Sequence, residues 1–195
     1  MKTPALLLVS LVLLPALVPA ATRKPTKPLS DAASMQQKLR HLDANAHAPH
    51  PDQTPTTLTE PEANAYFASG NVKLPAGVQS LRLAAEPEVI TGDAQIDFDR
   101  VREGTHSSNP LLSMFSGVHE VVVVAHAHGG GGQGFVHVDS VALDGVEIPH
   151  FVLELFVEKF LTPKNPQIGM DSQFTLPDRI DTATVGLHKL TVTQR

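Results

Sequence analysis

The histidines are the residues of this chain whose spacing most clearly points to chemistry. His126 and His128 stand two residues apart in a valine-rich run that is predicted to be a strand, so both side chains lie on one face. If His128 pairs with Gln133 across the following hairpin, His137 falls on that face as a diagonal neighbour of His126, about 7–8 Å away. Imidazoles that converge in this way can bind zinc, and Asp139 follows one step farther along. The pattern gives the hypothesis of a metal site formed by His126, His128 and His137.

The same histidines also fit a simpler interpretation, as the solvated face of an ordinary sheet. The opposite face of the hairpin is apolar, as expected when an antiparallel sheet packs one face on a core. A one-residue bulge in the glycine loop would turn His137 to that opposite face and remove the site. We therefore favour the solvated face, keep metal binding as the alternative and predict no cofactor. The residues expected on the apolar face are Val121, Val123, Ala125, Ala127, Val136, Val138 and Ala142.

Other motifs do not identify a reaction. The glycine run 129–134 contains G-x-G-x-x-G, but a strand follows it where the dinucleotide fingerprint needs a helix, so a hairpin loop is expected. His150, Glu154 and Glu158 recur at steps of four and are expected to face solvent on one side of a helix. The chain contains no cysteine and no zinc-protease, serine-hydrolase or P-loop motif. The sequence predicts no catalytic residue and favours a non-enzymatic role.

Composition and the N-terminus favour an exported protein. Of the 195 residues, 20 are acidic and 15 are Lys or Arg, and the net charge of −5 argues against a nucleic-acid partner. Residues 1–20 combine Lys2, an apolar stretch and small residues ending at Ala20, which predicts a secretory signal peptide. Because there is no cysteine, the fold must be held by its core and not by disulfides. We expect a periplasmic or extracellular location.

The chain is predicted to consist of a signal peptide at 1–20, a flexible N-terminal tail with a Pro-rich linker at 21–57, and a single α+β domain at 58–195. Thr59 and Glu62 have the spacing of a helix capping box. The expected elements are a helix at 31–46 in the tail, helix 59–69, strands 78–85 and 88–99, helix 109–117, strands 119–128, 133–143 and 146–148, helix 149–161, and terminal strands 174–176, 179–185 and 188–193.

The helix expected at 149–161 is apolar around most of its circumference. A helix of this kind is buried on more than one side. We therefore predict an α+β fold in which a curved, mostly antiparallel sheet wraps around this long apolar helix, with two shorter helices. Such an arrangement can leave an apolar groove between sheet and helix. The residues expected to line the groove are Val121, Val123, Val136, Val138, Phe151, Leu155 and Phe156.

Several short motifs resemble one group of exported bacterial proteins. The run LTEPEANAYF at 58–67 is similar to the L-T-E-x-x-x-N-A-Y helix of that group, and LPAGV at 74–78, IDFD at 96–99, LDGVEIP at 143–149 and FTLPDRI at 174–180 extend the similarity. These motifs resemble periplasmic lipid-binding proteins of the mycobacterial LmeA type and, more broadly, tubular lipid-binding domains. The resemblance implies a curved sheet that wraps a helix and holds acyl chains. It implies a lipid partner and transient membrane contact, and it assigns no individual contact residue.

Three hypotheses for function follow from the sequence. The first is a non-enzymatic exported domain that binds lipid or another apolar molecule, and the second is the histidine-based metal site. The third is an adaptor of an envelope protein complex, with a filled core and with its edge strands and residues 21–57 contacting a partner. The space inside the sheet separates the first from the third, because an open space favours a ligand and a filled one favours the adaptor.

Overall fold

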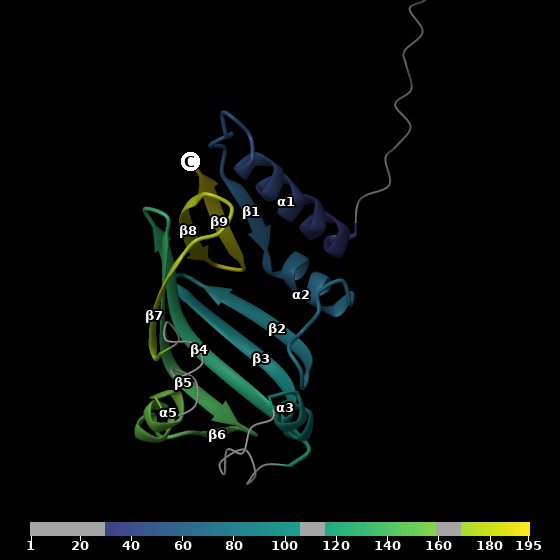
Figure 1. Cartoon of the computed structure of the whole chain (residues 1–195), viewed down its shortest axis with the longest axis vertical. Coiled ribbons are helices and arrows are strands. Elements are labelled where there is room, and N and C mark those ends of the chain that lie inside the picture. Colours follow the sequence, from purple (N-terminus) through teal and green to yellow (C-terminus); the bar gives the residue numbers. More distant parts are fainter. Residues whose placement is uncertain (1–29, 106–115, 159–168) are drawn as a thin grey trace, which may run out of the picture.

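The chain folds into an α+β structure built on one mostly antiparallel sheet. The computed structural model describes residues 30–105, 116–158 and 169–195. In these residues nine strands form a sheet that does not close on itself, accompanied by four helices (Figure 1). The α+β class and the mostly antiparallel sheet predicted from the sequence are confirmed.

The centre of the sheet is the long strand β4 (Val118–Gly130), which has partners on both sides. β3 (Val89–Asp97) runs along one edge of β4 and β5 (Gln133–Leu143) along the other, both antiparallel. β2 (Val78–Glu86) pairs with β3 and forms the outer strand on that side. Valine is the most frequent residue of β4, and its branched side chain favours strands. The bounds of β5 are those predicted.

Glycines make the connection between β4 and β5 tight. Gly131 and Gly132 have φ values of 60° and 76°, and two positive values in a row match a two-residue type I′ hairpin turn. Gly134 pairs opposite Phe174, and a Cβ at this glycine would lie 2.7 Å from the phenylalanine ring. The glycine run is therefore the hairpin loop that was predicted, and a strand follows it.

The remaining strands extend the sheet on both sides of β4. The order on one path is β1-β9-β8-β4-β3-β2, while β6 and β7 both pair with β5. β8 and β9 form the predicted terminal hairpin, and β1 adds to the outer edge of β9. The bounds of these strands are Thr56–Thr59 for β1, Val146–Glu147 for β6, Asp171–Thr175 for β7, Ile180–Gly186 for β8 and Lys189–Gln194 for β9.

The predicted N-terminal helix is present as α1 (Asp31–Ala46), and it packs against the rest of the fold. Ser30 caps its first turn through a hydrogen bond from the Ala33 amide. Leu42 of α1 is only 3% exposed and Val192 of β9 only 2%. The sequence predicted this helix in a flexible N-terminal tail. In the structure α1 is part of the packed fold.

Glu62 ties α1 to α2 (Glu60–Ala68). The capping box predicted for Thr59 and Glu62 is present at the start of α2. The Glu62 carboxylate also accepts hydrogen bonds from Lys38 Nζ at 2.6 Å and from the Ser34 hydroxyl at 2.5 Å. Burial alone would raise the pKa of Glu62, but the hydrogen bonds from Lys38, Ser34 and Thr59 outweigh burial and hold it at about 2. This buried carboxylate therefore stays charged and bonded over the whole neutral range.

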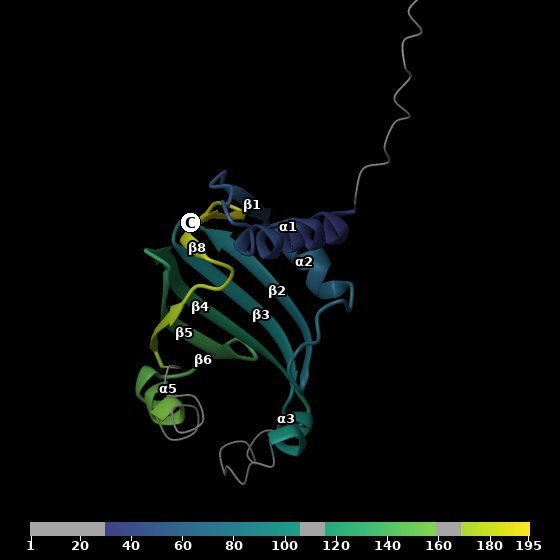
Figure 2. The same ribbon diagram turned by 45° about the horizontal axis from the view of Figure 1, so that its top comes forward.

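Helix α5 (His150–Phe156) forms the first part of the helix predicted at 149–161, and residues 157–158 continue it as a π-helical turn. It has seven residues, and positions 159–161 lie outside the described residues. Phe151 and Leu155 are 64% and 58% exposed, and Leu153 is buried at 8%. The helix lies at one end of the sheet beside β5 and β6 (Figure 1, Figure 2). No long apolar helix occurs in the part of the chain that the structure describes, so the predicted wrapping of the sheet around such a helix is not observed there.

One other predicted element differs from the structure, and one lies largely outside the described residues. The strand predicted at 88–99 ends at Asp97, whose side chain accepts hydrogen bonds from the amides of Asp99 and Arg100. These bonds start α3 (Phe98–Thr105), so the strand ends two residues earlier than expected. The helix predicted at 109–117 falls largely outside the described residues. None of the helices described is long and apolar enough to span a bilayer.

The packing of α1 gives a stability prediction. Leu42→Ala is expected to lower the free energy of unfolding by about 2–5 kcal/mol, because it removes a packed side chain and leaves a cavity. Urea denaturation followed by circular dichroism measures the change. Leu187→Ala, at a residue that is 60% exposed in the β8–β9 turn, serves as the control and should change stability by less than about 0.5 kcal/mol. Equal, small effects of both substitutions would show that α1 is not part of the cooperative fold.

Candidate functional site

Strands β2 to β5 place apolar side chains on one face of the sheet. The pairing sets Leu83 beside Gly92, Gly92 beside Val123, and Val123 beside Val141, in one row across the four strands. Because side chains alternate along each strand, every second residue on either side of this row shares the face. We call this surface the apolar face. Its residues are Leu81, Leu83, Ala85, Ile90, Gly92, Ala94, Ile96, Val121, Val123, Ala125, Ala127, Val136, Val138, Val141 and Leu143.

The apolar face is only partly covered. Ala125 is its one buried member, at 8% exposure, and the others are half-buried. Among the described residues, no large side chain anywhere is fully buried. The tightest packing lies at the other end of the molecule, around Leu42 and Val192. The sheet residues predicted to line a groove all lie on the apolar face and are Val121, Val123, Val136 and Val138.

The helix residues predicted for the same groove are placed differently. Phe151 and Leu155 are exposed on α5, so they do not close over the sheet. The side chain of Phe156 lies outside what the structure describes. The apolar face and the exposed side of α5 are therefore two separate apolar surfaces in the described residues.

At the β2 edge, the apolar face continues into a groove of about 880 Å³ between β2 and α2. Phe67 and Leu74 line this groove together with Leu81, which also belongs to the apolar face. Asn64 also lines the groove, and its side-chain amide bonds both the N–H and the C=O of Leu83 at 2.8 Å.

A bulge in β5 shapes both faces of the sheet. Val138 pairs with Ala125 and Ser140 pairs with Val124, so Asp139 has no opposite partner in β4. The extra residue reverses the alternation beyond it, which brings Val141 onto the apolar face. Ala142, which was predicted on the apolar face, lies on the opposite one. The sequence signal for the bulge is the polar pair Asp139-Ser140, which interrupts the strict alternation.

The predicted register of the histidine hairpin is wrong by two residues. The turn takes up only Gly131 and Gly132, so Gln133 pairs with Gly130 and not with His128. As a result His126 and His137 stand directly opposite each other. They lie on the side of the sheet opposite the apolar face, and we call this side the polar face. His128 lies on the same face, but its ring stacks on Phe135 with centroids 5.0 Å apart and planes at 17°.

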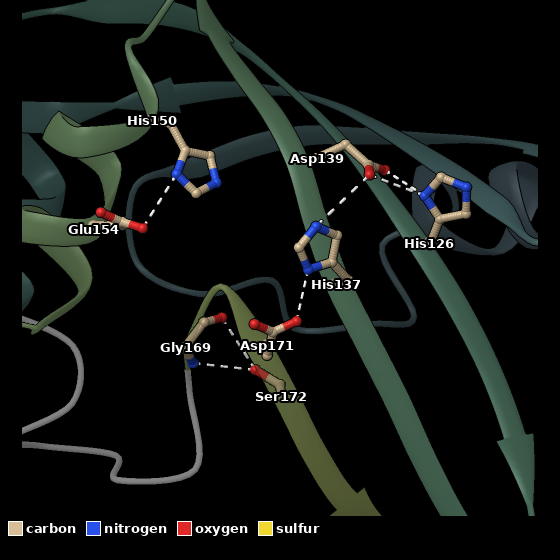
Figure 3. A network of polar contacts seen from close by, with 8 residues as sticks. All are labelled: His126, His137, Asp139, His150, Glu154, Gly169, Asp171 and Ser172. Carbon is tan, nitrogen blue, oxygen red and sulfur yellow. Dashed lines mark hydrogen bonds and ion pairs between the residues drawn. The ribbon is translucent and has the colours of Figure 1, made fainter.

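Two aspartates join His126 and His137 into a chain of polar contacts (Figure 3). His126 Nδ1 lies 2.8 and 2.9 Å from the two carboxylate oxygens of Asp139. His137 Nε2 lies 4.0 Å from Asp139 on one side, and His137 Nδ1 lies 2.6 Å from Asp171 on the other. We call these four residues the histidine–aspartate cluster. Asp171 comes from β7 and was not foreseen, because its position depends on a strand pairing that no local pattern reveals.

The electrostatics of the cluster favour a charged His137. The hydrogen bond with Asp171 raises its pKa above the usual value of 6.5, and the negative charges of Asp171 and Asp139 add to the increase. The imidazole is 50% exposed, so solvent screens these interactions. An open pocket of about 420 Å³, lined in part by Phe135 and Gln173, borders the cluster. The cluster is therefore accessible to small solutes and ions.

Similar pairs occur elsewhere but contain one histidine each. His119 lies 2.6 Å from Asp144, which raises the pKa of His119 and lowers that of the carboxylate. His188 lies 2.9 Å from Glu60. Within residues 30–105, 116–158 and 169–195, no three His, Asp or Glu side chains already stand around a common point as a finished metal site. Any ion at the histidine–aspartate cluster would require its side chains to turn.

Comparisons with known proteins add no assignment. No family model, curated protein or solved structure matches the chain. Function is therefore inferred from the two faces of the sheet and from the sequence patterns.

The Asp171–His137 pair predicts a pH dependence. Because its folded-state pKa is raised, His137 contributes stability that is fully present below pH 6.5 and is lost as the pH rises through the raised value. Asp171→Asn should return the pKa of His137 toward 6.5, which an NMR titration of the imidazole measures. The stability difference between the parent and this variant should be larger at about pH 5.5 than at about pH 8.5. Asp93→Asn, on β3, is the control and should leave the titration unchanged; an unshifted His137 in Asp171→Asn would contradict the assignment.

Proposed function

We propose that this chain is an exported, non-enzymatic domain that binds a lipid or another apolar molecule on the apolar face of its sheet. The observation that carries the proposal is that four adjacent strands present apolar side chains in successive rows, of which only Ala125 is buried. A sheet face of this composition normally packs against a second layer. An apolar ligand is the occupant that this surface suits.

The energetics of the surface support this proposal. Apolar area removed from water stabilises by about 25 cal/mol per Å², and a buried methylene by about 0.8 kcal/mol. The Val and Ile side chains of β3 and β4 are only half-buried, so burying them further would add to the free energy of stabilisation. An acyl chain of some ten carbons laid along the row would recover about 8 kcal/mol if every methylene were buried, and the cost of ordering the chain is subtracted from this gain.

The groove between α2 and β2 supplies a second supporting feature. Its volume of about 880 Å³ lies in the usual range of ligand pockets, about 300–1,000 Å³. Its lining combines Phe67 and Leu74 with the polar side chains of Asn64 and Arg82. An amphipathic molecule could place its polar end at Arg82 and its apolar part along Leu81 toward the apolar face.

The sequence patterns agree with the same proposal. The signal peptide predicted at 1–20 favours export, and the motif at 58–67 resembles the lipid-binding proteins of the LmeA type. In this proposal the curved sheet wraps an apolar ligand. The exposed Phe151 and Leu155 of α5 would serve the transient membrane contact through which a lipid is taken up.

Native mass spectrometry tests the proposal directly. The full chain, purified from cells without organic solvent, should carry a bound mass that organic extraction releases as lipid. A clean unliganded mass, together with no lipid in the extract, would count against the proposal and favour an adaptor with a filled core.

A matched pair of substitutions locates the binding surface. Val123→Thr places a hydroxyl on the apolar face, and Val122→Thr places the same group on the opposite face of the same strand. Burying an unpaired hydroxyl against an acyl chain costs about 1–3 kcal/mol, so Val123→Thr should weaken binding about tenfold. Displacement of a fluorescent fatty acid measures both variants. Equal affinities of the two would place the ligand elsewhere.

A further inference from the structure

Two imidazoles approach one carboxylate on the polar face, opposite the apolar face. His126 Nδ1 lies 2.8 Å from one Asp139 oxygen, and His137 Nε2 lies 4.0 Å from the other. Each of the other exposed histidine pairs described above joins one imidazole to one carboxylate. The arrangement around Asp139 is different, because a single carboxylate is shared by two nitrogen ligands.

The separations fit the spacing of metal ligands. Zinc binds His nitrogen and Asp oxygen at about 2.0–2.2 Å, and tetrahedral geometry then separates neighbouring ligand atoms by about 3.3 Å. The observed 2.8 and 4.0 Å lie on either side of that value. His126 is 55% exposed, His137 50% and Asp139 31%, so each side chain has room for the changes of about 0.5–0.7 Å in these separations that metal binding requires.

Asp171 can accept the hydrogen bond from the ring nitrogen of His137 that would not bind the metal. A ligating histidine almost always donates its other ring N–H to a carboxylate or carbonyl, which fixes the ring and its tautomer. Here Asp171 accepts the hydrogen bond of His137 Nδ1 at 2.6 Å, so the lone pair of the neutral ring is on Nε2, which faces Asp139.

The backbone holds these groups from three strands. His126 and His137 are paired residues of β4 and β5, the β5 bulge carries Asp139, and β7 carries Asp171 opposite His137. Side chains carried by strands are held in position more precisely than side chains carried by loops. The neighbouring open pocket admits solvent, so water can complete the coordination.

We propose that His126, His137 and Asp139 form a binding site for one divalent transition-metal ion such as zinc, and that Asp171 positions His137. On binding, the metal takes the place of the proton between His126 Nδ1 and Asp139, and that proton moves to the solvent side of the ring. A protonated His137 releases its Nε2 proton to solvent when Nε2 binds the metal. His128, which stacks on Phe135, is not a ligand. The proposal is independent of lipid binding, because the site lies on the opposite face of the sheet.

Isothermal titration calorimetry of the full chain, purified without a histidine tag, with zinc chloride at neutral pH tests the proposal. The expected result is one ion per chain. His137→Ala and Asp139→Asn should each weaken binding at least tenfold, and Asp171→Asn should weaken it about 10–100-fold without changing the stoichiometry. His188→Ala, which removes the histidine paired with Glu60, is the matched control and should bind zinc like the parent.

A second readout distinguishes a defined site from general binding by histidines. Zinc should raise the thermal midpoint of the parent and of His188→Ala, but not that of Asp139→Asn, whose side chain keeps the shape of aspartate. Circular dichroism confirms that each variant is folded; if His137→Ala is not, Asp139→Asn carries the test alone. Absence of stoichiometric zinc binding by the parent, or an equal loss in His188→Ala, would overturn the proposal. Repeating the titration on Val123→Thr should give the parent's affinity whether or not lipid binds.

Discussion

The structure depends on β4 having hydrogen-bonded partners along both edges. β3 pairs with β4 from Val118 to His126, and β5 pairs with it from Val121 to Gly130. A strand held on both sides cannot rotate, so its alternation assigns every side chain to one face of the sheet. This constraint places Val121 and Val123 on one face and His126 and His128 on the other. An apolar face and a polar face with different chemistry follow from one strand.

Local patterns predicted the local parts of this arrangement. Alternation located β5, the consecutive glycines gave the hairpin turn, and the spacing of Thr59 and Glu62 gave the capping box. The histidine register was wrong because it depends on turn length, and shortening the turn to two glycines moves every pair by two residues. The candidate site was predicted in part: His126 and His137 come together, but Asp171 joins them through β7, which is 34 residues from His137 along the chain.

The role of α1 shows a different limit of sequence reasoning. Its apolar stripe is narrow, which indicates a weakly held helix. In the folded chain α1 is held in part by hydrogen bonds to segments that are distant in the sequence. Asn45 bonds Gln194 at 2.8 Å across 149 positions, and Gln194 in turn bonds the Leu42 carbonyl at 2.7 Å. Both polar side chains are buried, so each bond is worth more than an exposed one and costs more to lose. Such pairing cannot be read from hydrophobic periodicity.

The bulge at Asp139 connects the two proposed sites physically, although they lie on opposite faces. In an unbroken strand Ser140 and Ala142 would share the face of Val138, and Val141 and Leu143 would share the face of His137. The extra residue exchanges these sets, so that the apolar face stays apolar to the end of β5. It also frees Asp139 from a cross-strand partner, which lets its carboxylate lie between the two imidazoles. One irregular residue thus keeps a continuous apolar surface on one side and places a shared carboxylate on the other.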